Sequence, residues 1–150
     1  MKVKLLLPTI FVMIFFLTGC INVLPKPSQI VLAGAVTSQG STASLQLNDD
    51  EGSSSNFKVP SDKVLVITNV LIIPIKTGNS KLELSLIQKG GGYSTDRIRY
   101  TWFLPATKPR NLDYSPGMKV SSNSTLAIKN ASSQPGEVYV SIHGYLADKN

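Results

Sequence analysis

The sequence KVLVITNVLIIPI, residues 63–75, is the most hydrophobic stretch of the chain after its first twenty residues. Most of its apolar side chains are β-branched and Pro74 would interrupt a helix, so we predict a long central β-strand, bent near Thr68 and Asn69. Residues 81–88, KLELSLIQ, alternate apolar and polar side chains. A period of two places their leucines on one face of a strand, whereas helical spacing would scatter them around a cylinder.

Shorter β-rich segments flank these two along the chain. We predict strands at residues 30–37, 41–47, 96–104, 118–120, 125–129 and 138–146. Within 41–47, Ala43, Leu45 and Leu47 alternate with polar side chains, which is typical of a strand with one solvent-facing side. Residues 48–56 and 107–116 are expected to be loops, and Gly90-Gly91-Gly92 a hairpin connection.

Eight or nine short strands, with no convincing amphipathic helix between them, predict an all-β chain. We expect residues 30–150 to form a single antiparallel β-sandwich, with a jelly roll as the first choice and an immunoglobulin-like sandwich as the alternative. The pairing of Phe57-x-Val59-Pro60 with residues 63–67, and the later Ser115-Pro116-Gly117-Met118, resemble jelly-roll modules of bacterial and phage proteins. This resemblance implies the fold only.

The first twenty residues have the pattern of an export signal. Lys2 and Lys4 precede an uncharged, mostly apolar run over residues 5–17. This run is too short for a transmembrane helix, which needs about 20 apolar residues. It ends in Leu17-Thr18-Gly19-Cys20, which resembles the lipobox of bacterial lipoproteins.

The lipobox resemblance implies that residues 1–19 are a signal peptide, cleaved after Gly19, and that the sulfur of Cys20 carries diacylglycerol. In many Gram-negative bacteria the new N-terminal amine is acylated too, and two or more acyl chains anchor a protein stably. The protein is then held at a membrane, outside the cytoplasm. Ile21 occupies the position at which Asp favours inner-membrane retention in similar lipoproteins, so the outer membrane is the expected location in a Gram-negative organism. The alternatives are an ordinary secretory signal that contains a cysteine, or an uncleaved anchor.

The segment between the lipid and the first strand is predicted to be a tether. Residues 20–29 comprise the lipidated cysteine and a spacer. We expect the spacer to be extended, because Pro25 and Pro27 disfavour regular structure. At about 3.1 Å per residue, the spacer can hold the domain roughly 25 Å from the lipid surface.

The net charge does not indicate a nucleic-acid partner. The whole chain has 15 basic and 9 acidic side chains, a formal net charge of +6. Loss of Lys2 and Lys4 with the signal leaves 13 basic side chains and a net charge of +4. They are scattered, without the block of like charges typical of a nucleic-acid arm, so no nucleic-acid partner is expected.

Candidate catalytic and metal-binding residues are few. His143 is the single histidine, and alternation places it beside Tyr139 and Ser141 on the solvated face of the last strand. No nucleophile elbow is present and Cys20 is assigned to the lipid, so we predict no catalytic residues, no cofactor and no enzymatic activity. The acidic segment 48–52 could offer oxygens to calcium, but adjacent carboxylates cannot all converge on one ion. We therefore predict a solvated loop there and no metal site.

The segment from residue 93 to residue 114 combines aromatic rings with arginines. The candidate ligand-binding residues are Tyr93, Arg97, Arg99, Tyr100, Trp102 and Tyr114. A flat aromatic face stacks on a sugar ring, so one hypothesis is a carbohydrate- or peptidoglycan-binding surface. The other, which we favour, is that Ile98, Tyr100 and Trp102 share one face of a strand and fill the core. The sequence thus predicts a non-enzymatic, membrane-anchored lipoprotein of the cell envelope, a binding or structural module whose partner is an envelope protein or a glycan.

Overall fold

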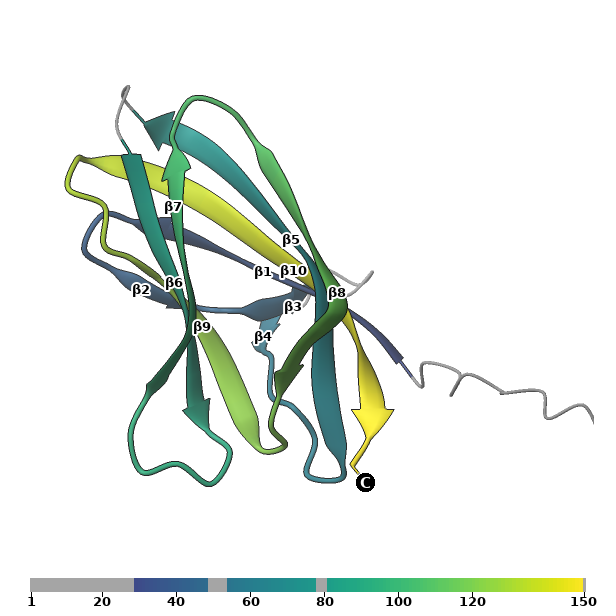
Figure 1. The fold of residues 1–150 in the computed structure, drawn as a ribbon. Coiled ribbons are helices and arrows are strands. Elements are labelled where there is room, and N and C mark those ends of the chain that lie inside the picture. The colour runs from purple at the N-terminus through teal and green to yellow at the C-terminus, as the bar shows by residue number, and fades with distance from the viewer. Residues whose placement is uncertain (1–28, 49–53, 78–80, 150) are drawn as a thin grey trace, which may run out of the picture.

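The computed structural model describes residues 29–48, 54–77 and 81–149, and these form two antiparallel sheets (Figure 1). The predicted lipobox, most of the tether and the acidic residues 49–52 lie outside the described residues. The strands are β1 (Gln29–Ser38), β2 (Thr42–Ser44), β3 (Gln46–Asn48), β4 (Ser54–Asn56), β5 (Lys63–Thr77), β6 (Lys81–Gly90), β7 (Arg97–Pro105), β8 (Arg110–Val120), β9 (Ser124–Asn130) and β10 (Gly136–Asp148).

The strand order identifies a jelly roll. One sheet has the order β4-β3-β1-β10-β5-β8 and the other the order β2-β9-β6-β7. Apart from the short β3 and β4, the strands form nested antiparallel pairs: β1 with β10, β2 with β9, β5 with β8, and β6 with β7. The first half of the chain therefore pairs with the second half in reverse order, as in a jelly roll. The predicted β-sandwich and its first-choice topology are confirmed.

The hydrophobic core lies between the two sheets. Leu84 and Leu86 of β6 are fully buried, as the alternation predicts. In β5 the register against β8 shifts between Ile67 and Asn69, and the bend predicted there is therefore a β-bulge. Because of this bulge, both Ile67 and Val70 point into the core and are 0% exposed.

The strand predicted at residues 41–47 is instead two short strands in different sheets. β2 pairs with β9 in the four-stranded sheet, whereas β3 pairs with β1 in the six-stranded sheet. The chain crosses between the sheets at Leu45, which is 0% exposed and whose amide donates to the Leu126 carbonyl oxygen at 2.9 Å. Within the loop predicted at 48–56, residues 54–56 form β4 on the edge of the six-stranded sheet.

The loop predicted at residues 107–116 is also wrong for most of its length, because β8 begins at Arg110. Its prolines suggested irregular structure. β8 is the outermost strand of its sheet, and an edge position tolerates proline, which has no N–H to donate. Pro116 also falls in the interval between two paired stretches, where Asn69 pairs with Asp113 and Ile67 pairs with Met118.

Within the described ranges, no helix is long and apolar enough to cross a bilayer.

Candidate functional site

The aromatic and arginine segment lies along one side of the sandwich. β7 is the outermost strand of the four-stranded sheet and β8 the outermost strand of the six-stranded sheet (Figure 1). The side chain of Arg99 connects the two edges, because its Nη2 donates to the backbone carbonyl of Lys119 at 2.8 Å. Arg99 and Lys119, which are 20 residues apart in the sequence, therefore meet where the edges of the two sheets come together.

Three aromatic rings close the gap between these edges. Trp102 is 3% exposed, and its indole Nε1 donates to the Tyr114 hydroxyl at 2.6 Å. The ring centroid of Tyr100 lies 5.6 Å from each of the other two rings. Trp102 is thus part of the core and presents no face on which a sugar could stack, whereas Tyr100 is 45% exposed.

The environment of Tyr114 changes its acidity. Burial raises the pKa of the Tyr114 hydroxyl above its ordinary value, and the hydrogen bond donated by Trp102 acts in the opposite direction. The neutral phenol is therefore the favoured form in the folded protein.

The face predicted for Ile98 is wrong. Ile98 pairs with Ile87 and Tyr100 pairs with Leu86, so Arg99 is an extra residue in a β-bulge. The bulge reverses the alternation, and Ile98 lies outside the sandwich with 66% exposure. A pattern of alternating residues assumes unbroken pairing with the neighbouring strand, and a bulge breaks this assumption.

The remaining two candidate residues contact each other. The guanidinium carbon of Arg97 lies 3.6 Å from the centroid of the Tyr93 ring, a cation–π contact. Arg97 is exposed and Tyr93 half-buried. Of the candidate residues, Arg97 and Tyr100 are therefore exposed and Tyr93 is half-buried, and the ring of Tyr100 packs against Trp102 and Tyr114.

His143 lies on the outer face of the six-stranded sheet, as the alternation of its strand predicts. Val138, Val140 and Ile142 on the opposite face of β10 are 0% exposed, whereas His143 is exposed. Its cross-strand neighbours are Leu32 and Asn69. In the part of the chain that the structure describes, no three His, Cys, Asp or Glu residues gather in a way that could hold a metal ion.

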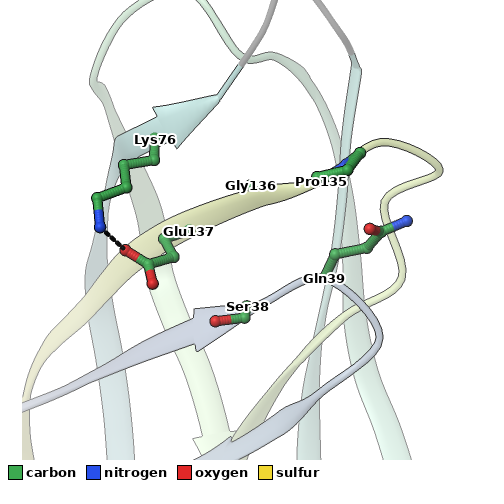
Figure 2. Close-up of a pocket in the computed structure, with 6 residues that line it drawn as sticks. All are labelled: Ser38, Gln39, Lys76, Pro135, Gly136 and Glu137. Atoms are coloured by element: carbon green, nitrogen blue, oxygen red, sulfur yellow. Dashed lines mark ion pairs between the residues drawn. The ribbon is translucent and has the colours of Figure 1, made fainter.

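A shallow recess of about 440 Å³ lies at one end of the sandwich, where β1 ends and β10 begins (Figure 2). It is lined by Ser38, Gln39, Lys76, Pro135, Gly136 and Glu137. The backbone N–H of Gln39 donates to the backbone carbonyl of Gly136, with 3.0 Å between nitrogen and oxygen. This bond joins two of the three chain segments that line the recess. Lys76 Nζ lies 3.3 Å from Glu137 Oε2, so the charges in the recess balance. No local sequence pattern indicates this recess, because its residues come from three separate parts of the chain.

Comparisons with known proteins do not assign a family. No family matches the sequence, and no curated protein matches it either. Solved structures resemble the fold at low similarity, as two examples show. The Drosophila NLP core, described in terms of pentamer formation and histone binding, is 17% identical with a TM-score of 0.44, covering 81% of this chain and 100% of that chain. A mitogen derived from Yersinia pseudotuberculosis is 16% identical with a TM-score of 0.34, covering 81% of this chain and 90% of that chain.

Proposed function

We propose that this protein is a lipid-anchored component of the bacterial cell envelope, a non-enzymatic β-sandwich that acts as a binding or structural module. The observation that carries the proposal is the sequence Leu17-Thr18-Gly19-Cys20 at the end of a short apolar run with a basic start. A thiol at this position is the nucleophile that lipid transfer requires. Two acyl chains on Cys20 would hold the domain at the membrane.

The geometry of β1 supports an orientation for the anchored domain. β1 begins at Gln29, nine residues after Cys20, and runs to Ser38. With a rise of about 3.3 Å per residue, the two ends of this strand lie roughly 30 Å apart. The recess near Ser38 is therefore at the opposite end of β1 from the point where the tether would join the domain, and we infer that this end faces a partner in the envelope.

Replacement of Cys20 by Ser tests the anchor. We expect the wild-type chain to fractionate with membranes and its N-terminal peptide to carry acyl mass, and both properties to be lost in Cys20→Ser. Ile21→Asp is the matched control, because it keeps the thiol. It should stay lipidated, and in a Gram-negative host it should move to the inner membrane. Complete membrane partitioning of Cys20→Ser would contradict the proposal.

A glycan-binding surface is a second candidate, favoured by the exposed ring of Tyr100 and by the cation–π pair of Tyr93 and Arg97. We expect such a surface to bind peptidoglycan fragments saturably and to lose this binding in Tyr100→Ala. Phe103→Ala, which removes an exposed ring from the other side of β7, is the control. Absence of saturable binding by the wild-type chain, or equal loss in both variants, would remove this candidate.

A further inference from the structure

The predicted tether leads into one end of the sandwich, which we call the tether end. Gln29, the first residue of β1, is in register with Leu146 of β10, and Leu146 is in register with Leu65 of β5. Val120, the last residue of β8, pairs with Leu65 and completes this row. The tether end is therefore the end at which β1 begins and at which β8 and β10 end.

The connection between β6 and β7 lies at the same end. β8 ends at Val120 and β9 begins at Ser124, and Ser124 pairs with Gly90, the last residue of β6. Residues 91–96 then lead into Arg97, the first residue of β7. In Figure 1 this connection and the C-terminus point in the same direction. The start of β7 therefore belongs to the tether end.

Three basic side chains gather where β7 and β8 meet near the tether end. Arg97 and Arg99 are two residues apart, so their Cα atoms lie within about 7 Å of each other. The Nη2 atom of Arg99 donates to the backbone carbonyl of Lys119, the residue before Val120. We call Arg97, Arg99 and Lys119 the basic cluster.

None of the three side chains has a carboxylate partner among the described residues. The ion pairs there all involve other basic residues: Lys63 with Asp62 and Asp148, Lys76 with Glu137, and Lys89 with Asp96. Arg97 and Lys119 are exposed, and Arg99 is half-buried. Positive charges without counter-ions repel one another at such spacing, and a bound anion would relieve this repulsion.

Both arginines are held in place by contacts within the chain. The guanidinium carbon of Arg97 lies 3.6 Å from the centroid of the Tyr93 ring, and its N–H groups have no hydrogen-bond partner among the described residues. Arg99 is held by its bond to the Lys119 carbonyl. Guanidinium groups bind phosphate oxygens in a bidentate manner, and a fixed group loses less side-chain entropy on binding. The cluster therefore suits phosphate groups.

Exposed apolar side chains accompany these charges. Ile98, between the two arginines, is 66% exposed, and Tyr100 is 45% exposed. β7 is the outermost strand of its sheet, so a surface that approaches its edge meets both faces of the strand. An isoleucine gains nothing from a dissolved anion, but it can be buried in the headgroup region of a bilayer, where tyrosine rings are also favoured. The combination favours an anionic lipid surface over a soluble anion.

We propose that the basic cluster, together with Ile98 and Tyr100, is a second membrane contact that binds the phosphate groups of anionic lipids. The proposal rests on the lipid anchor at Cys20, because the anchor brings the tether end to a bilayer. Gln29 follows Cys20 by nine residues, which span at most about 30 Å. Each basic side chain near an anionic bilayer strengthens the attachment roughly fivefold. The domain then lies against the membrane, with the recess at the opposite end facing away from it.

Reconstitution of the acylated full chain into vesicles tests the proposal. Acylation blocks the thiol of Cys20, the only cysteine, so a single introduced cysteine can carry an environment-sensitive fluorophore. Ser94→Cys places the label in the β6–β7 connection, and Ser133→Cys places it at the opposite end, before β10. Both positions are exposed.

The two labels should respond differently to anionic lipid. We expect the fluorescence of the Ser94→Cys label to rise several-fold when phosphatidylcholine vesicles are replaced by vesicles that also contain phosphatidylglycerol. It should fall again in high salt, which screens the attraction. The Ser133→Cys label should not change.

Charge-neutralising variants in the Ser94→Cys background show whether the basic cluster is responsible. Arg97→Gln combined with Arg99→Gln should lower the ratio of membrane-bound to free domain roughly tenfold or more. Lys108→Gln combined with Arg110→Gln is the matched control, because it removes the same charge from the opposite end. If circular dichroism shows that the first pair is unfolded, Arg97→Gln alone replaces it and should lower the ratio roughly fivefold.

Several outcomes would overturn the proposal. These are an unchanged Ser94→Cys label in phosphatidylglycerol vesicles, equal losses in the two pairs of variants, or release of the label by peptidoglycan fragments, since the same residues would then bind a glycan. Mass spectrometry of the N-terminal peptide separates this failure from failure of the lipid anchor. A chain without acyl mass would remove the anchor and this contact together, whereas an acylated chain whose label does not respond would remove this contact alone.

Discussion

Two inner strands of the sandwich, β6 and β5, carry different residues on their outer faces. On β6 of the four-stranded sheet the outward residues include Glu83 and Ser85, whereas on β5 of the six-stranded sheet they include Leu71 and Ile73. Both strands bury leucine or isoleucine on their inner faces. At these positions β6 is polar on its outer face, whereas β5 carries apolar side chains on both faces. Leu71 and Ile73 are nevertheless half-buried, because side chains of the neighbouring strand β10 lie beside them.

The largest expected effect separates the inner and outer faces of a single strand. Trp102→Ala should destabilise the fold by about 3–5 kcal/mol, because it leaves a cavity between the sheets. Phe103→Ala, on the outer face of the same strand, should change stability by about 0.5 kcal/mol or less. Chemical denaturation measures both values. If Trp102→Ala melted like the wild-type chain, the assignment of Trp102 to the core would be wrong.

A smaller effect is expected on the outer face of the six-stranded sheet, at Tyr139 of β10. Tyr139→Ala should cost about 1–2 kcal/mol, because the ring covers Gly34 and its cross-strand neighbours. Lys129→Ala on the other outer face should be nearly neutral. Thermal unfolding of both variants is the measurement. Equal melting temperatures would show that the two outer faces contribute alike, which contradicts the comparison.

Ser85 and Ser141 allow a second comparison between the outer faces of the two sheets. Ser85 on β6 is hydrogen-bonded to Thr101, with 3.0 Å between the hydroxyl oxygens, whereas the buried hydroxyl of Ser141 on β10 has no partner in the described structure. Ser85→Ala should therefore cost about 1 kcal/mol, and Ser141→Ala should be neutral or slightly stabilising. Urea midpoints with unchanged m-values would measure the difference. A larger loss for Ser141→Ala would mean that its hydroxyl is satisfied.

The smallest effect concerns the alkaline stability of the β7–β8 edge. The pKa of Tyr114 is raised, so its contribution to stability is fully present below the pKa of an unfolded tyrosine, near 10. It is lost as the pH rises through the higher folded-state pKa. The melting temperature of Tyr114→Phe should therefore fall less steeply above pH 10 than that of the wild-type chain.

Lys63 serves as an internal reference in this experiment. A hydrogen bond to Asp148 raises the pKa of Lys63, so its contribution is also lost at high pH. It is present in both proteins, and the difference between their pH profiles belongs to Tyr114. Parallel profiles would contradict the assignment.

Local patterns predicted the strands that follow regular rules. The alternation of residues 81–86 and the bend of residues 63–75 correspond to β6 and to the bulge in β5. The predictions failed where the position of a strand in its sheet, or an irregular pairing with the neighbouring strand, overrode the local pattern. The prolines near Pro116 did not prevent β8 from forming, because this strand lies at a sheet edge. The bulge at Arg99 turned Ile98 to the outside.

The candidate sites show the same division. The sequence raised the core as one of two interpretations of Trp102, but the hydrogen-bonded contact with Tyr114 needs the β7 and β8 edges to meet. The recess at Lys76 and Glu137 joins residues far apart in the chain, and no local pattern could have indicated it. The composition of an apolar strand such as β5 likewise does not show whether one or both of its faces are buried.

The all-β class, the alternation of β6 and the lipobox pattern at Cys20 can be recognised without a structure, because each depends on residues that are close together in the chain. Strand pairing, the positions of the bulges and the buried face of each strand become visible only in the folded chain. These properties depend on contacts between residues that are far apart, such as those between β1 and β10. The apolar run of residues 63–75 illustrates both: its composition favours a central strand, and the fold places Ile67, Val70 and Ile72 in the core and leaves Leu71 and Ile73 half-buried on the outer face.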